Sequence, residues 1–197
     1  MFQGTQSVKF LFYTNLLIFA ITFVLAALNI NILGPFVLWS YNSELFLPHQ
    51  LITYQFLHGG FLHLIFNMLA LVSILPAVED YLDSKKFLIY YLICGIFAGL
   101  FNTFMTGSTI PMVGASGSIW GMVVMFAVLF PNTELLFMFI PIPIKAKWFV
   151  LGYGAFELFS GLKGSAGDNI AHFAHLGGML FGFILLKYWQ KQKNSFY

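Results

Sequence analysis

A serine set between glycines is the first feature of this sequence that could carry chemistry. Ser116 lies in the run Gly114-Ala115-Ser116-Gly117-Ser118, at the start of an apolar stretch. Backbone N–H groups at a helix start lack helical partners and the helix dipole is positive there, which suits a nucleophile whose reaction creates a negative oxygen. The G-x-S-x-G motif of soluble hydrolases is not matched, because Ser118 occupies its last glycine position. Taken alone, such a serine is more often a helix N-cap.

A histidine at the start of a later apolar stretch could serve as the base. His175 shares one helix face with two small residues spaced by four, Gly178 and Gly182. The stretch that begins with Ser116 carries an equivalent pair, Gly117 and Gly121. Such small-xxx-small strips let helices approach closely in lipid. Close approach would bring Ser116 next to His175 as its general base, with Trp120 packed against the imidazole.

A third polar cluster lies earlier in the chain. His63 and Asn67 are four residues apart and share a helix face. They could form hydrogen bonds between helices, or they could donate to an oxyanion. His58 precedes Gly59-Gly60, and we expect it to lie in the loop and hold that loop through hydrogen bonds to the backbone.

The composition indicates that these groups are set in lipid. Of 197 residues, 59% are hydrophobic and 8% charged, against about 25% charged in a soluble domain. The mean hydropathy is +0.85. A chain of this size cannot bury so much apolar surface from water. The single cysteine, Cys94, excludes a disulfide scaffold, and a net charge of +2 with lysine as the only basic residue type argues against a nucleic-acid partner.

Apolar periodicity predicts an all-α, polytopic membrane protein. A transmembrane helix needs about 20 mostly apolar residues. Six stretches meet this need and leave only short loops, so we expect one membrane domain over residues 1–197. The stretches are 9–28, 57–78, 87–106, 115–130, 147–163 and 170–188.

The lysines orient the six stretches. Eight of the nine lysines fall on one side when both termini are placed in the cytoplasm, and only Lys163 falls outside. The positive-inside rule favours that arrangement. His63, Ser116 and His175 then all lie near the outer leaflet, at the beginning of stretches that run inward.

Other hydrolytic mechanisms fit less well. No H-E-x-x-H metal motif is present, and we expect neither metal nor cofactor. Asp168 precedes His175 by seven residues, about 10 Å along a helix, so we interpret it as a helix cap rather than a triad member. Glu157 could handle protons, but a hydrogen bond near a helix end is the interpretation we favour. A Ser-His dyad remains.

Three motifs in order resemble the rhomboid family of intramembrane serine proteases. They contain His58, His63 and Asn67; Gly114, Ser116 and Gly117; and Ala174, His175, Gly177, Gly178 and Gly182. The resemblance implies that Ser116 is the nucleophile and His175 its base. It also implies an oxyanion hole formed by Asn67, His63 and the Ser116 N–H, with Gly114 and Trp120 lining the substrate site and Trp120 stacked on the histidine.

The resemblance further implies a six-span protease of the cell membrane, of the compact bacterial type, that cleaves transmembrane segments of other membrane proteins. The first outer loop departs from some members, because Pro48-His49-Gln50 replaces a Trp-Arg pair and leaves the anchoring of that loop open. A catalytically inactive rhomboid-like scaffold is the alternative. A small transporter or channel is a second, but the inner halves of the stretches carry few polar residues.

Overall fold

The computed structural model describes residues 4–30, 32–107, 110–137, 140–163 and 171–194, and the fold within them is mostly helical. The first half contains three long helices and two short ones: α1 (Gln6–Ala27), α2 (Gln50–Thr53), the 3₁₀ helix η1 (Tyr54–Phe56), α3 (Phe61–Leu82) and α4 (Ser84–Thr106). The second half contains α5 (Ser116–Leu129), the strands β1 (Glu134–Phe137) and β2 (Ile140–Lys145), α6 (Ala146–Lys163) and α7 (His172–Asn194).

Each of the six predicted apolar stretches falls on one long helix. Within the described residues, α1, α3 and α4 are long and apolar enough to cross a membrane, and α5 is apolar but shorter. The largest boundary difference is at α7, which runs to Asn194 rather than ending at residue 188, and α3 begins at Phe61 rather than at residue 57. Gly60 is its N-cap with an extended backbone, so the two glycines end the loop before the helix starts.

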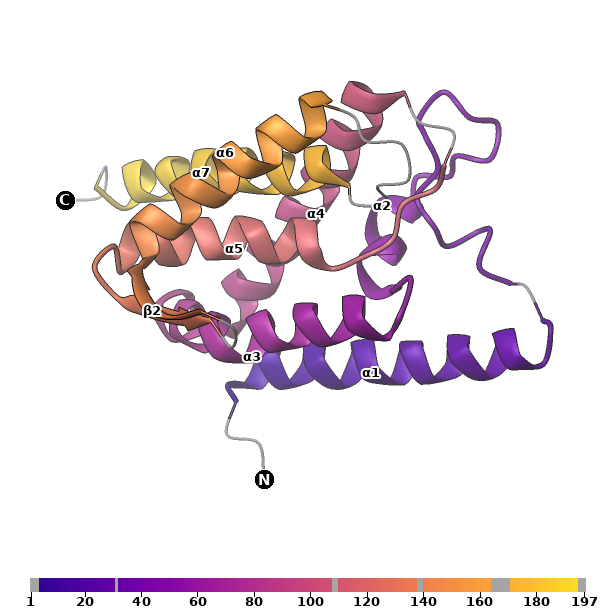
Figure 1. Ribbon diagram of the computed structural model, residues 1–197, viewed down its shortest axis with the longest axis horizontal. Helices are drawn as coiled ribbons and strands as arrows, with labels where there is room; N and C mark the ends of the chain where they lie inside the picture. Colours follow the sequence, from indigo (N-terminus) through magenta and orange to yellow (C-terminus); the bar gives the residue numbers. More distant parts are fainter. Residues whose placement is uncertain (1–3, 31, 108–109, 138–139, 164–170, 195–197) are drawn as a thin grey trace.

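Helix α5 lies at the centre of the bundle. Figure 1 shows α3 and α1 beneath it and α6 and α7 above it, and α3, α4, α6 and α7 all contact it. Ten of its 14 residues are buried, so it is apolar on every side. The main core around it includes Leu71 of α3, Tyr90 of α4, Met122 of α5 and Leu186 of α7.

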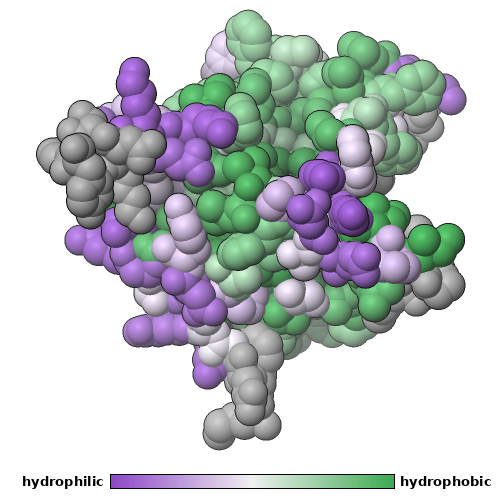
Figure 2. Space-filling model, turned by 90° about the vertical axis from the view of Figure 1, so that its left-hand side faces the viewer, coloured by the Kyte–Doolittle hydropathy of each residue, from purple (hydrophilic) through white to green (hydrophobic). Residues whose placement is uncertain are grey.

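The outer helices expose large apolar side chains. Phe23 of α1 is 67% exposed and Phe159 of α6 is 68% exposed, as only a lipid-facing surface would favour. Figure 2 shows that hydrophilic residues gather around an apolar centre at one end of the molecule, where α7 ends and the β1–β2 hairpin lies. The chain segments at this end carry exposed lysines, namely Lys85, Lys86, Lys145, Lys187 and Lys191.

A buried carboxylate fastens α1 to α3 and α4. Glu79, near the end of α3, accepts hydrogen bonds from the backbone N–H groups of Ser7 (2.7 Å) and Val8 (2.9 Å) and from the hydroxyls of Thr5 and Ser84. The N–H groups of a first helical turn have no partner within the helix, and the dipole favours a negative charge beside them. Glu79 therefore caps α1 from another helix.

The turn from α3 to α4 is capped locally. Asp83 has a positive φ of 70° and accepts a hydrogen bond from the backbone N–H of Lys86 at 3.0 Å. Hydrogen bonds from the Lys86 side chain and backbone hold the pKa of the Asp83 carboxyl below its usual value.

A β-hairpin between α5 and α6 was not predicted from the sequence. Strands β1 and β2 pair antiparallel, with Glu134 opposite Lys145 and a register irregularity between Leu135 and Phe137. Exposed Leu136 and Ile142 lie on it. The prolines within β2 argue against a strand in the sequence, because proline is depleted in sheets and confined to edge strands.

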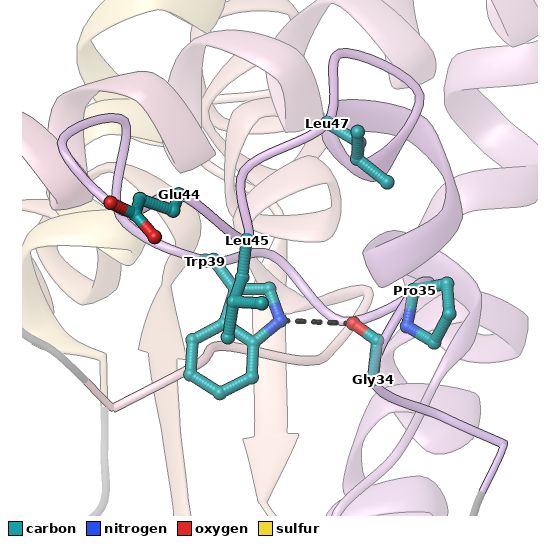
Figure 3. Close-up of a pocket in the computed structure, with 6 residues that line it drawn as sticks. All are labelled: Gly34, Pro35, Trp39, Glu44, Leu45 and Leu47. Carbon is teal, nitrogen blue, oxygen red and sulfur yellow. Dashed lines mark hydrogen bonds between the residues drawn. The ribbon is translucent and has the colours of Figure 1, made fainter.

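The first loop is anchored by the residues that replace the Trp-Arg pair. The Gln50 side chain is buried, accepts from the Trp39 N–H at 3.3 Å and donates to the Leu45 carbonyl at 2.9 Å. The His49 ring bonds the Pro35 carbonyl at 2.8 Å. Figure 3 shows the Trp39 indole donating to Gly34 at one side of a loop pocket, and no candidate site residue lines that pocket.

Candidate active site

Ser116 is the first residue of α5 and is partly buried. Its side chain makes no N-capping hydrogen bond, because the N-cap position is Ala115, which lies in helical geometry. The hydroxyl is therefore free to face another element. Ser118, the other serine of the motif, is 1% exposed and donates to Gln55 Oε1 at 2.9 Å, so it is engaged in packing α5 against η1.

Glycines bring α7 against α5. A Cβ built on Gly178 would lie 2.0 Å from the Gly117 carbonyl oxygen, and one built on Gly182 would lie 2.7 Å from the Gly121 Cα. No side chain fits at either position without moving a backbone. The two backbones are thus in direct contact along a line that starts beside Ser116 and His175.

That contact sets the central geometry of the site. Ser116 Oγ lies 2.8 Å from His175 Nε2, although 59 residues separate them. The histidine is 8% exposed, and its hydrogen bond to the serine is only partly buried. A hydroxyl and an imidazole nitrogen at this distance are within reach for proton transfer.

The second ring nitrogen of His175, Nδ1, has a partner that the sequence analysis did not assign. Glu157 of α6 places Oε1 at 2.8 Å from His175 Nδ1 and Oε2 at 2.5 Å from His172 Nδ1. Glu157 is 1% exposed. The sequence did contain one sign of this role, because a carboxylate in the middle of an apolar helix is costly in lipid and marks a functional group. The position of Glu157 in the sequence did not indicate which residue it faces.

Trp120 does not stack on His175, contrary to the expectation from the resemblance. Their ring centroids are 6.3 Å apart with an interplanar angle of 47°. Trp120 instead stacks on Tyr153 of α6 at 3.7 Å and 13°. Tyr153 belongs to a helix distant in sequence from Trp120, and its ring is the one that stacks on the indole. The rings of Trp120 and Tyr153 together line this side of the site.

His63 and Ser116 border the same small space. A Cβ built on Gly114 would lie 2.8 Å from His63 Nε2 and 3.7 Å from Ser116 Oγ. Gly114 has a φ of 133°, which disfavours any side chain. A side chain at Gly114 would therefore collide with the His63 ring, so the glycine lets that ring approach the chain next to Ser116.

Asn67 lies one turn along α3 from His63 and is 5% exposed. Its side-chain amide donates to the His63 carbonyl at 2.8 Å. An asparagine amide has two N–H donors, so this bond leaves one donor for another acceptor.

His58 precedes α3 as expected, and its ring interacts with the backbone of Phe56 in the segment before the helix. By geometry, neither ring nitrogen has a hydrogen-bond partner among the described residues. The ring also packs edge-on against His63, with centroids 5.2 Å apart. His58 thus lies against the loop backbone and supports the His63 ring by contact. Asp168, interpreted above as a helix cap, lies outside the described residues.

The fold and site define a helical protein with long apolar segments and a serine–histidine pair between two of them. The rhomboid domain family matches residues 47–191. The chain therefore belongs to the rhomboid family, and it is an integral membrane protein with a polytopic helical fold.

Relatives agree with this membership. The chain is 36% identical over 139 residues to the rhomboid-type protein YdcA of Bacillus subtilis (strain 168), covering 69% of this chain and 64% of YdcA. It is 35% identical over 136 residues to rhomboid protease GluP of the same organism, covering 68% of this chain and 24% of GluP. It is 30% identical over 146 residues to the mitochondrial rhomboid protein 1 of Saccharomyces cerevisiae, covering 71% of this chain and 42% of that protein. The chain thus spans less than two thirds of each of these relatives.

Proposed function

We propose that the chain is an intramembrane serine endopeptidase that hydrolyses peptide bonds in or near transmembrane segments of membrane proteins. The observation that carries the proposal is the 2.8 Å hydrogen bond between Ser116 Oγ and His175 Nε2. Membership of a family whose relatives include the rhomboid protease GluP supports it.

In the first half of the reaction, Ser116 Oγ attacks the carbonyl carbon of the substrate and passes its proton to His175 Nε2. The carbonyl oxygen becomes an oxyanion, for which His63, Asn67 and the Ser116 N–H are the proposed donors. The carbon–nitrogen bond then breaks, and His175 gives its proton to the leaving amine. An ester between Ser116 and the substrate remains.

In the second half, water gives a proton to His175 while its oxygen attacks the ester. The new oxyanion occupies the same donors. The bond to Ser116 Oγ breaks, the hydroxyl regains a proton from His175, and a carboxylic acid is released. The partly buried position of Ser116 supports the entry of water to it.

We further propose one membrane domain over residues 1–197 that crosses the cell membrane, a bacterial inner membrane, six times with both termini in the cytoplasm. The gathering of lysines at the end of the molecule opposite Ser116 supports this orientation. The site then faces the outer leaflet. Its substrates are transmembrane proteins, reached through the bilayer.

The test is cleavage of model transmembrane substrates by purified protein in liposomes. Wild type is expected to cut, and Ser116→Ala and His175→Ala are expected to reduce the rate by at least about 10⁴-fold. Ser118→Ala is the matched control, because Ser118 sits two residues away and points into the η1 contact. It is expected to keep the wild-type rate to within about threefold, because the Ser118 hydroxyl binds packing residues and not the reacting groups.

Cutting that survives Ser116→Ala would overturn the proposal. An uncut panel of substrates with diverse transmembrane sequences, given a folded wild type, would favour the inactive scaffold instead.

A further inference from the structure

The carboxylate of Glu157 is placed to act on His175. It comes from α6, whereas both of its histidine partners come from the first turn of α7. Each carboxylate oxygen faces one Nδ1, at 2.8 Å for His175 and 2.5 Å for His172. An ionised carboxylate only accepts hydrogen bonds, so both imidazoles donate from Nδ1.

This bond fixes which nitrogen of His175 is the base. With the proton held on Nδ1, Nε2 presents its lone pair to the Ser116 hydroxyl at 2.8 Å. A carboxylate on Nδ1 also stabilises the imidazolium that forms when the serine proton is taken up. Serine, histidine and glutamate from three different helices thus form one continuous hydrogen-bonded chain.

His172 fixes the orientation of the carboxylate. It is 8% exposed and binds the oxygen that does not face His175, so rotation of the carboxylate would break two hydrogen bonds. The hydroxyl of Tyr153 also faces Glu157, but it lies 3.5 Å from His175 Nδ1, beyond good hydrogen-bond range. His63 of α3 also faces His175.

We infer that Glu157 is a positioning residue for His175, held in place by His172, so that the site works as a Ser-His-Glu triad in place of the dyad expected from the sequence. The inference rests on the proposed function. A role limited to clasping α6 against α7 is the competing explanation, and it makes different predictions for kinetics.

Glu157→Gln separates the two, because it keeps the shape and removes the charge. As a triad member, its loss is expected to lower kcat by about 10²–10⁴-fold with little change in KM, by analogy with the effect of replacing the acid of a serine protease triad. Glu157→Asp is expected to restore part of kcat, and His172→Asn to lower kcat by a smaller factor than Glu157→Gln.

Glu79→Gln is the matched control. Glu79 is also a carboxylate buried at a helix junction, and it lies near the opposite end of α3 from His63. Its replacement is expected to lower the unfolding temperature and to leave kcat and KM at wild-type values. A clasp role for Glu157 predicts the same pattern for Glu157→Gln, and that result would overturn the inference.

A spectroscopic measurement keeps the inference independent of the proposed function. Nitrogen-15 NMR of labelled histidines is expected to show neutral His175 protonated at Nδ1 in the wild type. That tautomer is expected to be lost in Glu157→Leu, because leucine offers no acceptor for the Nδ1 proton. Lack of cleavage by wild type would overturn the proposed protease, while the tautomer would still test the Glu157 contact. A His175 tautomer that is unchanged by Glu157→Leu would overturn the positioning role.

Discussion

Gly178 of α7 lies directly on Gly117 of α5, so that a Cβ added to Gly178 would come within 2.0 Å of the Gly117 carbonyl oxygen. Gly117 follows Ser116, and Gly178 lies three residues after His175. The distance between the serine hydroxyl and the imidazole is therefore set by a contact between two backbones, which is stiffer than a contact between side chains.

Gly178→Ala is expected to push the two helices apart and destabilise the protein by about 1–3 kcal/mol, as overpacking a tight contact does. The cleavage rate is expected to fall by more than the loss of folded protein explains, because the Ser116–His175 distance lengthens. Activity and thermal unfolding in detergent check this. Gly152→Ala is the control, since Gly152 of α6 has open space around it, and its stability is expected to stay equal or rise by up to about 1 kcal/mol.

Gly114→Ala is expected to impair catalysis with the serine and histidine still present. Its methyl group would lie 2.8 Å from His63 Nε2 and force the His63 ring to move, and a φ of 133° is strained for alanine. We expect kcat to fall by about 10²-fold, a typical cost of misplacing reacting groups by about 1 Å. Gly60→Ala, at an extended φ with nothing nearby, is expected to retain activity. Equal kcat values for the two variants would contradict the proposed role of His63 as an oxyanion donor.

Asn67→Ala tests the amide donor. We expect kcat to fall by about 10²–10³-fold, as for loss of one oxyanion donor. Asn15→Ala removes the same kind of bond far away, since the Asn15 amide donates to the Leu11 carbonyl four residues earlier at 2.7 Å. Cleavage rates of both variants, each checked for thermal unfolding, decide the matter. A parallel small loss in both would mean that Asn67 contributes only to the helix.

Glu79→Ala is expected to destabilise the protein without altering the site. Removing the carboxylate leaves the Ser7 and Val8 N–H groups unpaired at the start of α1. Each unpaired buried donor is expected to lower the free energy of unfolding by about 1–3 kcal/mol. The unfolding temperature in detergent is expected to fall while kcat of the folded enzyme stays constant. Asp80→Asn, next in sequence and exposed, is expected to change neither quantity.

The hydrogen-bonded loop around Gln50 is one feature that the sequence could not predict. The absence of a Trp-Arg pair was readable, but the replacement was not, because Gln50 reaches backbone groups of Trp39 and Leu45 that only the folded loop brings near. The β1–β2 hairpin was missed for a related reason, since cross-strand pairing and proline tolerance depend on where the strands lie.

The sequence by itself determined the helical membrane character, the six apolar stretches and the residues with chemical potential, because hydropathy and the four-residue spacing of Gly178 and Gly182 are local properties of the chain. Only the tertiary structure decided what those residues touch. It stacked Tyr153 on Trp120 beside His175, and it turned Glu157 toward His175 and His172. Helix rotation and depth are set by packing among several helices at once, and no pattern within one helix records which neighbour its polar side chain will meet.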